Sequence, residues 1–148
     1  MEGNLGQVLE NCLQCRVLTL ATRGPRDLPM SAALFFAYTP DLRLFFLSSP
    51  KSQHSLNLER DPRASVCFFP SPSDDWRQIR GVQMVGNGRI ATGKEAAEGW
   101  AVYLRRFGFV VTLASEVKKT RLYCFTPEWV RLIDNRRGLG HKEEWFLE

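Results

Sequence analysis

The chain is organised around residues 44–58, which read LFFLSSPKSQHSLNL. The apolar run at 44–47 predicts a strand, the Ser-Ser-Pro at 48–50 predicts a turn, and residues from about 51 to 60 predict a helix. Where a helix begins, the backbone N–H groups and the helix dipole favour a bound anion. Because serine hydroxyls and a lysine lie in the same turn, the stretch predicts an anion site.

On either side of this stretch, short apolar segments alternate with turns that contain proline, glycine or aspartate. Apolar and β-branched runs of this kind predict strands, and three segments have the spacing of amphipathic helices. Since the connections are too short for helical crossovers, neighbouring strands should be antiparallel. We therefore expect one domain, residues 1–148, that is mainly β: a six-stranded antiparallel barrel with peripheral helices. The expected strands are 17–22, 29–38, 42–47, 64–69, 78–92 and 121–134, the last interrupted at Thr126-Pro127, and the expected helices are 5–15, 51–60 and 93–107.

The composition is that of a globular chain, since 44% of its 148 residues are hydrophobic and 24% are charged. No apolar run approaches the ~20 residues of a membrane-spanning helix, and the first four residues lack the pattern of a signal peptide. A cytoplasmic protein with no membrane partner is therefore expected. The net charge of +4 comes from scattered residues, of which Arg105-Arg106, Lys118-Lys119 and Arg136-Arg137 are the densest pairs. Such pairs are typical of a solvated surface, and no nucleic-acid partner is expected.

Few residues in the chain are suited to chemistry. Cys12 and Cys15 have the C-x-x-C spacing, but no second such pair accompanies them, so we interpret them as core residues and expect no metal site. The only histidines are His54 and His141. No nucleophile elbow, phosphate-binding loop or dinucleotide-binding glycine motif occurs. No catalytic residue is identified, and an enzyme with this sequence would need a cofactor to carry its chemistry.

Several segments, in this order and spacing, resemble the pyridoxamine-phosphate-oxidase-like family of FMN-binding split barrels. The resemblance runs from about residue 17 to residue 88 and includes the strand, turn and helix at 44–58. Its other parts are Leu18-Thr19-Leu20-Ala21-Thr22, Asp61-Pro62-Arg63-Ala64-Ser65-Val66 and Gly81-Val82-Gln83-Met84-Val85-Gly86. Within the family, the chain is similar to a small group with Arg-Gly-Val-Gln and a later Gly-x-Gly-x-Lys, here Arg80-Gly81-Val82-Gln83 and Gly138-Leu139-Gly140-His141-Lys142.

The resemblance implies an FMN-binding split barrel, a homodimer with FMN in two clefts between subunits, and oxidation or reduction of an unknown small molecule. It implies that the turn after the third strand holds the FMN phosphate, that the second strand lines the isoalloxazine ring, and that further residues approach from the second subunit. The phosphate residues are Leu47, Ser48, Ser49, Lys51, Ser52, Gln53 and His54. The ring-lining residues are Ser31, Ala32, Ala33 and Leu34, and those from the second subunit are Gln83, Lys142 and Trp145.

One departure from the family changes the expected behaviour. The family usually has Lys or Arg where this chain has Gln53 and His54, and histidine is only partly charged at neutral pH. We therefore expect FMN binding that weakens at high pH, with Lys51 as the other candidate cation. Two alternatives stay open: a flavin or haem sensor or carrier, with His54 or His141 as a haem ligand, and a structural dimer without ligand. Trp145 either closes the barrel or stacks near the flavin.

Overall fold

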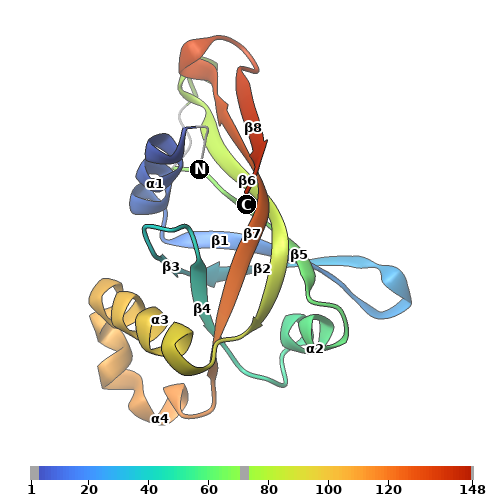
Figure 1. Cartoon of the computed structure of the whole chain (residues 1–148), viewed down its shortest axis with the longest axis vertical. Coiled ribbons are helices and arrows are strands. Elements are labelled where there is room, and N and C mark those ends of the chain that lie inside the picture. The colour runs from blue at the N-terminus through green and yellow to red at the C-terminus, as the bar shows by residue number, and fades with distance from the viewer. Residues whose placement is uncertain (1–3, 71–73, 148) are drawn as a thin grey trace.

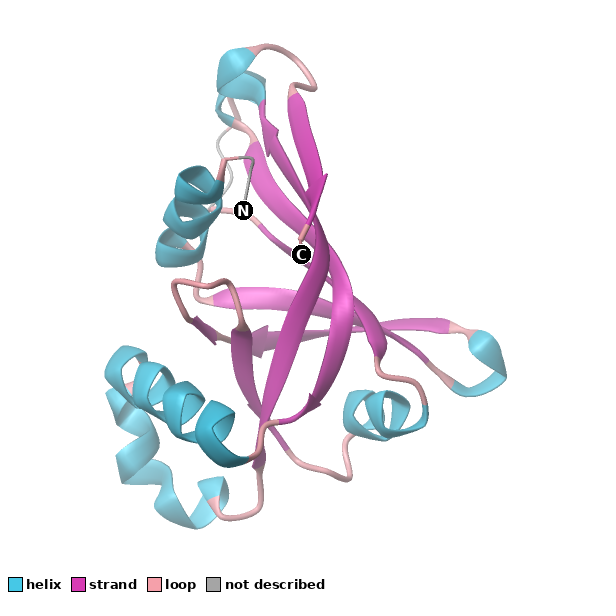
Figure 2. Cartoon of the chain, viewed as in Figure 1, coloured by secondary structure: helices cyan, strands magenta, loops and turns pink. Residues whose placement is uncertain are grey.

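The computed structural model describes residues 4–70 and 74–147, which form one curled antiparallel sheet with helices around it (Figures 1 and 2). Part of the predicted proline-rich loop, residues 71–73, lies outside the described residues. The helices are α1 (Leu5–Gln14), α2 (Gln53–Arg60), α3 (Gly93–Arg106) and α4 (Ala114–Val117). The strands are β1 (Val17–Arg23), β2 (Pro29–Phe35), β3 (Ala37–Tyr38), β4 (Leu44–Ser48), β5 (Arg63–Phe68), β6 (Arg80–Ile90), β7 (Arg121–Asp134) and β8 (Lys142–Phe146).

The sheet closes on itself through a bend at Phe36. Its strands follow the order β2-β1-β5-β6-β7-β4-β3, with β8 paired to β7. β2 pairs with β1, and β3 pairs with β4, so the segment that bends at Phe36 joins the two ends of the order. The predicted antiparallel split barrel is thus confirmed. The described residues contain eight strands rather than six, because the expected strand 29–38 divides at the bend and the tail adds β8.

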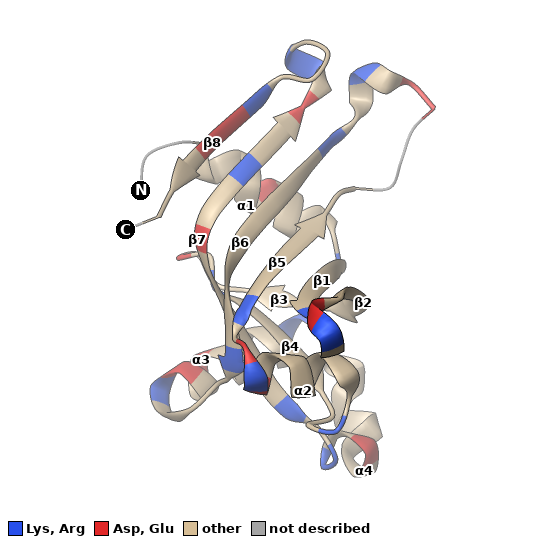
Figure 3. Cartoon of the chain, turned by 90° about the vertical axis from the view of Figure 1, so that its right-hand side faces the viewer, with Lys and Arg blue, Asp and Glu red and all other residues tan. Residues whose placement is uncertain are grey.

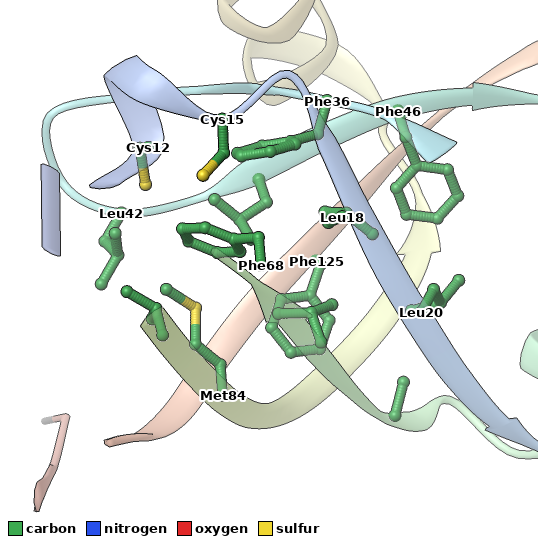
Figure 4. Close-up of a cluster of buried hydrophobic side chains, with 14 of the residues drawn as sticks. Cys12, Cys15, Leu18, Leu20, Phe36, Leu42, Phe46, Phe68, Met84 and Phe125 are labelled. Carbon is green, nitrogen blue, oxygen red and sulfur yellow. The ribbon is translucent and has the colours of Figure 1, made fainter. Parts of the chain in front are cut away.

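The inside of the barrel is filled by one large apolar cluster. In β1 the alternate residues Leu18 and Leu20 are fully buried, as the period of two in a strand requires. Aromatic rings from four other strands or turns complete the cluster (Figure 4). Phe46 stacks on Tyr123 with 5.3 Å between ring centroids, and Phe36 lies 5.0 Å from Phe68. Burial of these rings is the main source of stability in such a core.

The helices cover the barrel from outside. α1 places both of its C-x-x-C cysteines in the core (Figure 4), and burial raises the pKa of the Cys15 thiol. The described residues contain no group of His, Cys, Asp and Glu that could hold a metal ion.

α3 packs on the outer side of β4, where Tyr103 and Phe107 meet Phe45. None of the described helices has the length and apolarity needed to cross a membrane.

The predicted interruption of the last strand at Thr126-Pro127 is wrong, because β7 runs through the proline without a break. Proline has no N–H to donate to the ladder, and the sheet accommodates it with a register shift between Val85 and Gly86 of β6. Gly86 pairs directly with Pro127. A β-carbon on Gly86 would lie 2.1 Å from the carbonyl oxygen of Thr126, so this close approach requires glycine.

We expect Gly86→Ala to lower the free energy of unfolding by about 3 kcal/mol, since the clash is with backbone that cannot move aside. Gly6→Ala is the matched control. It lies in α1 with open space around it, and alanine should add about 1 kcal/mol there through helix propensity. Urea unfolding of both variants measures the effect. A Gly86→Ala protein as stable as the parent would show that the register shift at Gly86 does not depend on glycine.

Candidate functional site

The turn after β4 gathers three hydroxyls and one imidazole, which we call the serine–histidine cluster: Ser48, Ser52, His54 and Ser55. Ser48 Oγ lies 2.5 Å from His54 Nε2 and 2.9 Å from Ser52 Oγ. Ser52 Oγ lies 3.2 Å from the same imidazole nitrogen. Ser55 closes the ring, since its hydroxyl donates to Ser48 Oγ at 3.1 Å and lies 2.8 Å from Ser52 Oγ. The cluster is a compact set of groups able to donate to one anion.

The local sequence explains why these side chains meet. Pro50 begins a turn that ends β4, and Ser52 is the N-cap of α2, with its hydroxyl accepting from the Ser55 amide at 3.4 Å. Within the described residues, the amides of Gln53 and His54 donate to no acceptor. The first turn of a helix leaves such donors free, and they can point at a bound anion. The structure thus brings hydroxyls and free backbone amides together at the turn where the sequence predicts an anion site.

The imidazole of His54 is half-buried beside the ring of Phe46, with 6.5 Å between ring centroids. Burial lowers the pKa of His54 below its ordinary value, because desolvation disfavours the charged form. The histidine is thus neutral near pH 7 in the absence of an anion. In that state it exchanges a hydrogen bond with the serine hydroxyls, and a bound dianion would favour its protonation instead.

Full cations near the cluster are few. Lys51 is exposed in the turn, and Gln53 uses its amide to donate to Asn57 Oδ1 at 2.8 Å. Arg121, the first residue of β7, was not predicted as a site residue, and the register places it directly opposite Ser48. Side chains of such a pair share a face, with about 5 Å between their β-carbons. Arg121 is exposed and donates only to the Thr120 carbonyl among the described residues, so it is a second candidate for charge neutralisation.

The second predicted component, β2, has a free edge. Within the described residues β2 is hydrogen-bonded to β1 only, although it also lies beside β4 and α2. α2 is fixed there by Asn57, whose amide donates to Thr22 Oγ1 at 3.0 Å. Ser31 and Ala33 are exposed, whereas Ala32 and Leu34 are partly buried. The unpaired backbone groups of this edge can hydrogen-bond a planar ligand whose phosphate lies at the α2 N-terminus.

Leu47 does not face the cluster. It precedes Ser48 in β4, so its side chain points to the opposite side of the strand, where it packs against the apolar cluster under α3. Ser49 contributes mainly to the turn, because its hydroxyl accepts from the Lys51 amide at 3.2 Å and its carbonyl from Ser52 Oγ at 2.8 Å.

Gln83 lies on a different surface, the outer sheet face, which we define by the rows Cys67–Gln83–Arg131–Glu144 and Ser65–Val85–Trp129–Phe146 of strands β5, β6, β7 and β8. These strands lie side by side in Figure 3. Beside Gln83 is a cavity of about 540 Å³, lined by Cys67, Phe69, Ile79, Gln83 and Ile133 among others. The cavity is mostly apolar, with the Gln83 amide as one of its few polar groups.

Gln83 is oriented by Arg131, which the sequence analysis missed. The guanidinium of Arg131 donates to Gln83 Oε1 at 3.3 Å and to Glu144 Oε2 at 2.9 Å, and it lies 4.9 Å from the ring of Trp129. With its oxygen engaged, Gln83 has its amide N–H₂ available as a donor. Alternation along residues 129–133 places Arg131 on one face of its strand. Only the register between β6 and β7 shows that Gln83 lies on the same face.

The two predicted tail residues are on opposite faces. Lys142 is exposed and pairs with Ile133 at the end of the outer sheet face. Trp145 pairs with Val130 on the inner face and packs against the core, with its buried Nε1 lacking a partner in the described residues. This packing favours the role in closing the barrel. From β2 to β6 there are three strand spacings, about 14 Å, so one chain does not bring Gln83 to the free edge of β2.

Comparison with known proteins finds a matching family and similar chains. Residues 5–134 match the family model described as pyridoxamine 5'-phosphate oxidase. A UPF0306 protein of Klebsiella pneumoniae is 29% identical over 115 residues, which are 77% of this chain and 74% of that protein.

Two solved structures share the fold at identities too low to show more than the fold. A heme binding protein from Mycobacterium smegmatis has a TM-score of 0.81 at 20% identity, covering 99% of this chain and 59% of that one, so this chain spans about three-fifths of its length. A Clostridium acetobutylicum protein related to general stress protein 26 has a TM-score of 0.73 at 14% identity, covering 97% and 94%. Since the match to the family model runs from the first residue of α1 to the last residue of β7, the chain belongs to the pyridoxamine 5'-phosphate oxidase family.

Proposed function

We propose that this chain is an FMN-binding flavoprotein that oxidises or reduces a small molecule. The observation that carries the proposal is the serine–histidine cluster at the start of α2, next to the free edge of β2. A phosphate needs several donors at one point, and an isoalloxazine ring needs backbone donors and acceptors on its polar edge. The two features lie beside each other in the fold, as this ligand requires.

The residues present fit the phosphate group of FMN. The hydroxyls of Ser48 and Ser52 and the free amides of Gln53 and His54 would donate to its oxygens, while Lys51 and Arg121 would balance its charge. The backbone of residues 31–34 would hold the ring. Bound FMN supplies hydride and electron transfer, and the chain supplies orientation and exclusion of water.

The proposal includes a homodimer. The Gln83 N–H₂ group donates to no acceptor among the described residues, and it lies on the outer sheet face, three strand spacings away from the free edge of β2 within one chain. A second copy packed on that face could bring its own Gln83 and Lys142 to the ring of the first. Val85 and Phe146 are 46% and 78% exposed there, which supports contact with another protein surface.

Haem is the second candidate ligand of the same barrel. His141 has a buried Nε2 without a partner in the described residues, and one structural neighbour is a heme binding protein. Absorbance separates the candidates. A protein that takes up FMN with the spectrum of bound flavin supports the proposal, and a Soret band after haem addition, without flavin uptake, contradicts it.

We expect Arg121→Ala to weaken FMN binding about tenfold, since a cation opposite Ser48 is lost. Lys118→Ala, an exposed position three residues earlier, is the matched control and should bind as the parent does. Fluorescence quenching of FMN measures both affinities. Equal affinities in the two variants would remove Arg121 from the site, and no FMN binding by the parent would refute the proposed cofactor.

FMN affinity should fall several-fold as the pH rises from about 6.5 to about 8.5. The phosphate is largely dianionic over this range, whereas His54 starts with a lowered pKa and must take up a proton to pair with it. Each step to higher pH makes that proton harder to supply, so binding weakens. His54→Gln keeps a polar side chain but should remove the slope. A parent protein with the same affinity at both pH values would show that His54 stays neutral in the complex.

We expect Val85→Arg to convert a dimer into a monomer and to weaken FMN binding, because a charge would be buried in the proposed interface. Val111→Arg, at an exposed position outside the outer sheet face, should change neither property. Light scattering after size-exclusion chromatography gives the mass. If only Val111→Arg dissociates the dimer, the interface lies elsewhere, while a monomeric parent that binds FMN with full affinity rules the dimer out.

A further inference from the structure

A second cavity, of about 430 Å³, lies on the side of the barrel opposite to the outer sheet face, between α1, β3 and α3. In Figure 1 these three elements follow one another along one side of the molecule. Among the residues that line the cavity are Leu13, Arg16, Tyr38, Val102, Arg105 and Arg106. Its size is within the range of small-molecule sites. Three of its lining residues are arginines: Arg16, just before β1, and the consecutive Arg105 and Arg106 at the end of α3.

Arg106 is the fixed cation of this cavity. One of its guanidinium nitrogens donates to the carbonyls of Cys12 and Cys15 at 2.8 and 2.5 Å, at the C-terminal end of α1. The guanidinium also lies over three rings, at 5.2 Å from Phe36 and 5.3 Å from Tyr38. Its other terminal nitrogen, NH1, is buried and has no partner within the described residues. Arg106 is therefore held in a fixed position, and it keeps one donor unsatisfied within the described residues.

The positive charge around Arg106 is not neutralised. None of the three arginines forms an ion pair with a carboxylate in the part of the chain that the structure describes. Arg106 has a lowered pKa because it is desolvated, and the charge of Arg16 lowers it further. Arg16 and Arg105 are exposed, so their side chains are free to turn toward a ligand. Like charges held together in this way are stabilised by a bound anion.

We propose that this cavity binds a small organic anion that carries a phosphate or two carboxylates on a short apolar or aromatic body. Arginine forks suit oxyanions of this kind because they bind two oxygens at once. Leu13, Val102 and the Tyr38 ring provide apolar surface for the body of the ligand. The site shares no residue with the serine–histidine cluster or with β2, so it is separate from the proposed flavin site.

The experiment uses pyrophosphate as the probe, titrated calorimetrically into the full chain at low ionic strength, where charge pairs are least screened. Arg16→Ser/Arg105→Ser removes the two mobile cations, and Lys118→Ser/Lys119→Ser removes two exposed cations elsewhere. The parent should bind pyrophosphate saturably, the arginine variant at least about tenfold more weakly, and the lysine variant as the parent does. Ser52→Ala/His54→Ala should keep this binding, which separates it from the proposed phosphate site of FMN.

Thermal unfolding without the probe checks that each variant folds. With pyrophosphate added, the midpoint of the parent should rise and that of the arginine variant should not. The proposal is overturned by an absence of saturable binding in the parent, or by arginine and lysine variants that lose affinity equally. It is also overturned if the loss occurs only in Ser52→Ala/His54→Ala, since pyrophosphate would then occupy the turn after β4.

Discussion

The bend at Phe36 is the constraint on which both candidate sites depend. Its amide donates to the Arg16 carbonyl at 3.0 Å, and its ring is fully buried, so the chain must leave β1 at that residue and continue along β4. This change of partner closes the barrel. It also leaves one edge of β2 without a strand partner in the part of the chain that the structure describes, beside the turn after β4, and it brings Tyr38 of β3 under the guanidinium of Arg106. A straight strand at 29–38 would create neither surface.

The two candidate sites differ in how they would neutralise the charge of an anion. Around His54 the groups are neutral and already hydrogen-bonded to each other, so an anion must exchange for existing bonds and bring a proton with it. Around Arg106 the charge is permanent, because arginine stays protonated, and no carboxylate of residues 4–70 or 74–147 forms an ion pair with it. Binding of an anion by the first arrangement would depend on pH, whereas binding by the second would depend on ionic strength.

Local patterns in the sequence were sufficient for much of this structure. The alternation in β1 and the stretch at 44–58 predict strands, a helix and an anion site, and the short connections predict antiparallel order. What local patterns cannot give is register. The pairing of Arg121 with Ser48, of Arg131 with Gln83, and of Gly86 with Pro127 each joins residues far apart in the chain. From the sequence alone, Pro127 therefore predicts a break in the strand, because its pairing with Gly86 cannot be recognised there.

Contacts between helices, like register, distinguish residues that look alike in the sequence. Arg105 and Arg106 form one of three basic pairs that composition assigns to a solvated surface. Only Arg105 is exposed, because Arg106 reaches the end of α1, a helix that precedes it by 92 residues or more. A guanidinium that docks one helix to another has its position fixed before any ligand arrives. Pre-organised charge of this kind costs little to use in binding, and the same bonds that secure α1 therefore prepare the cavity beside it.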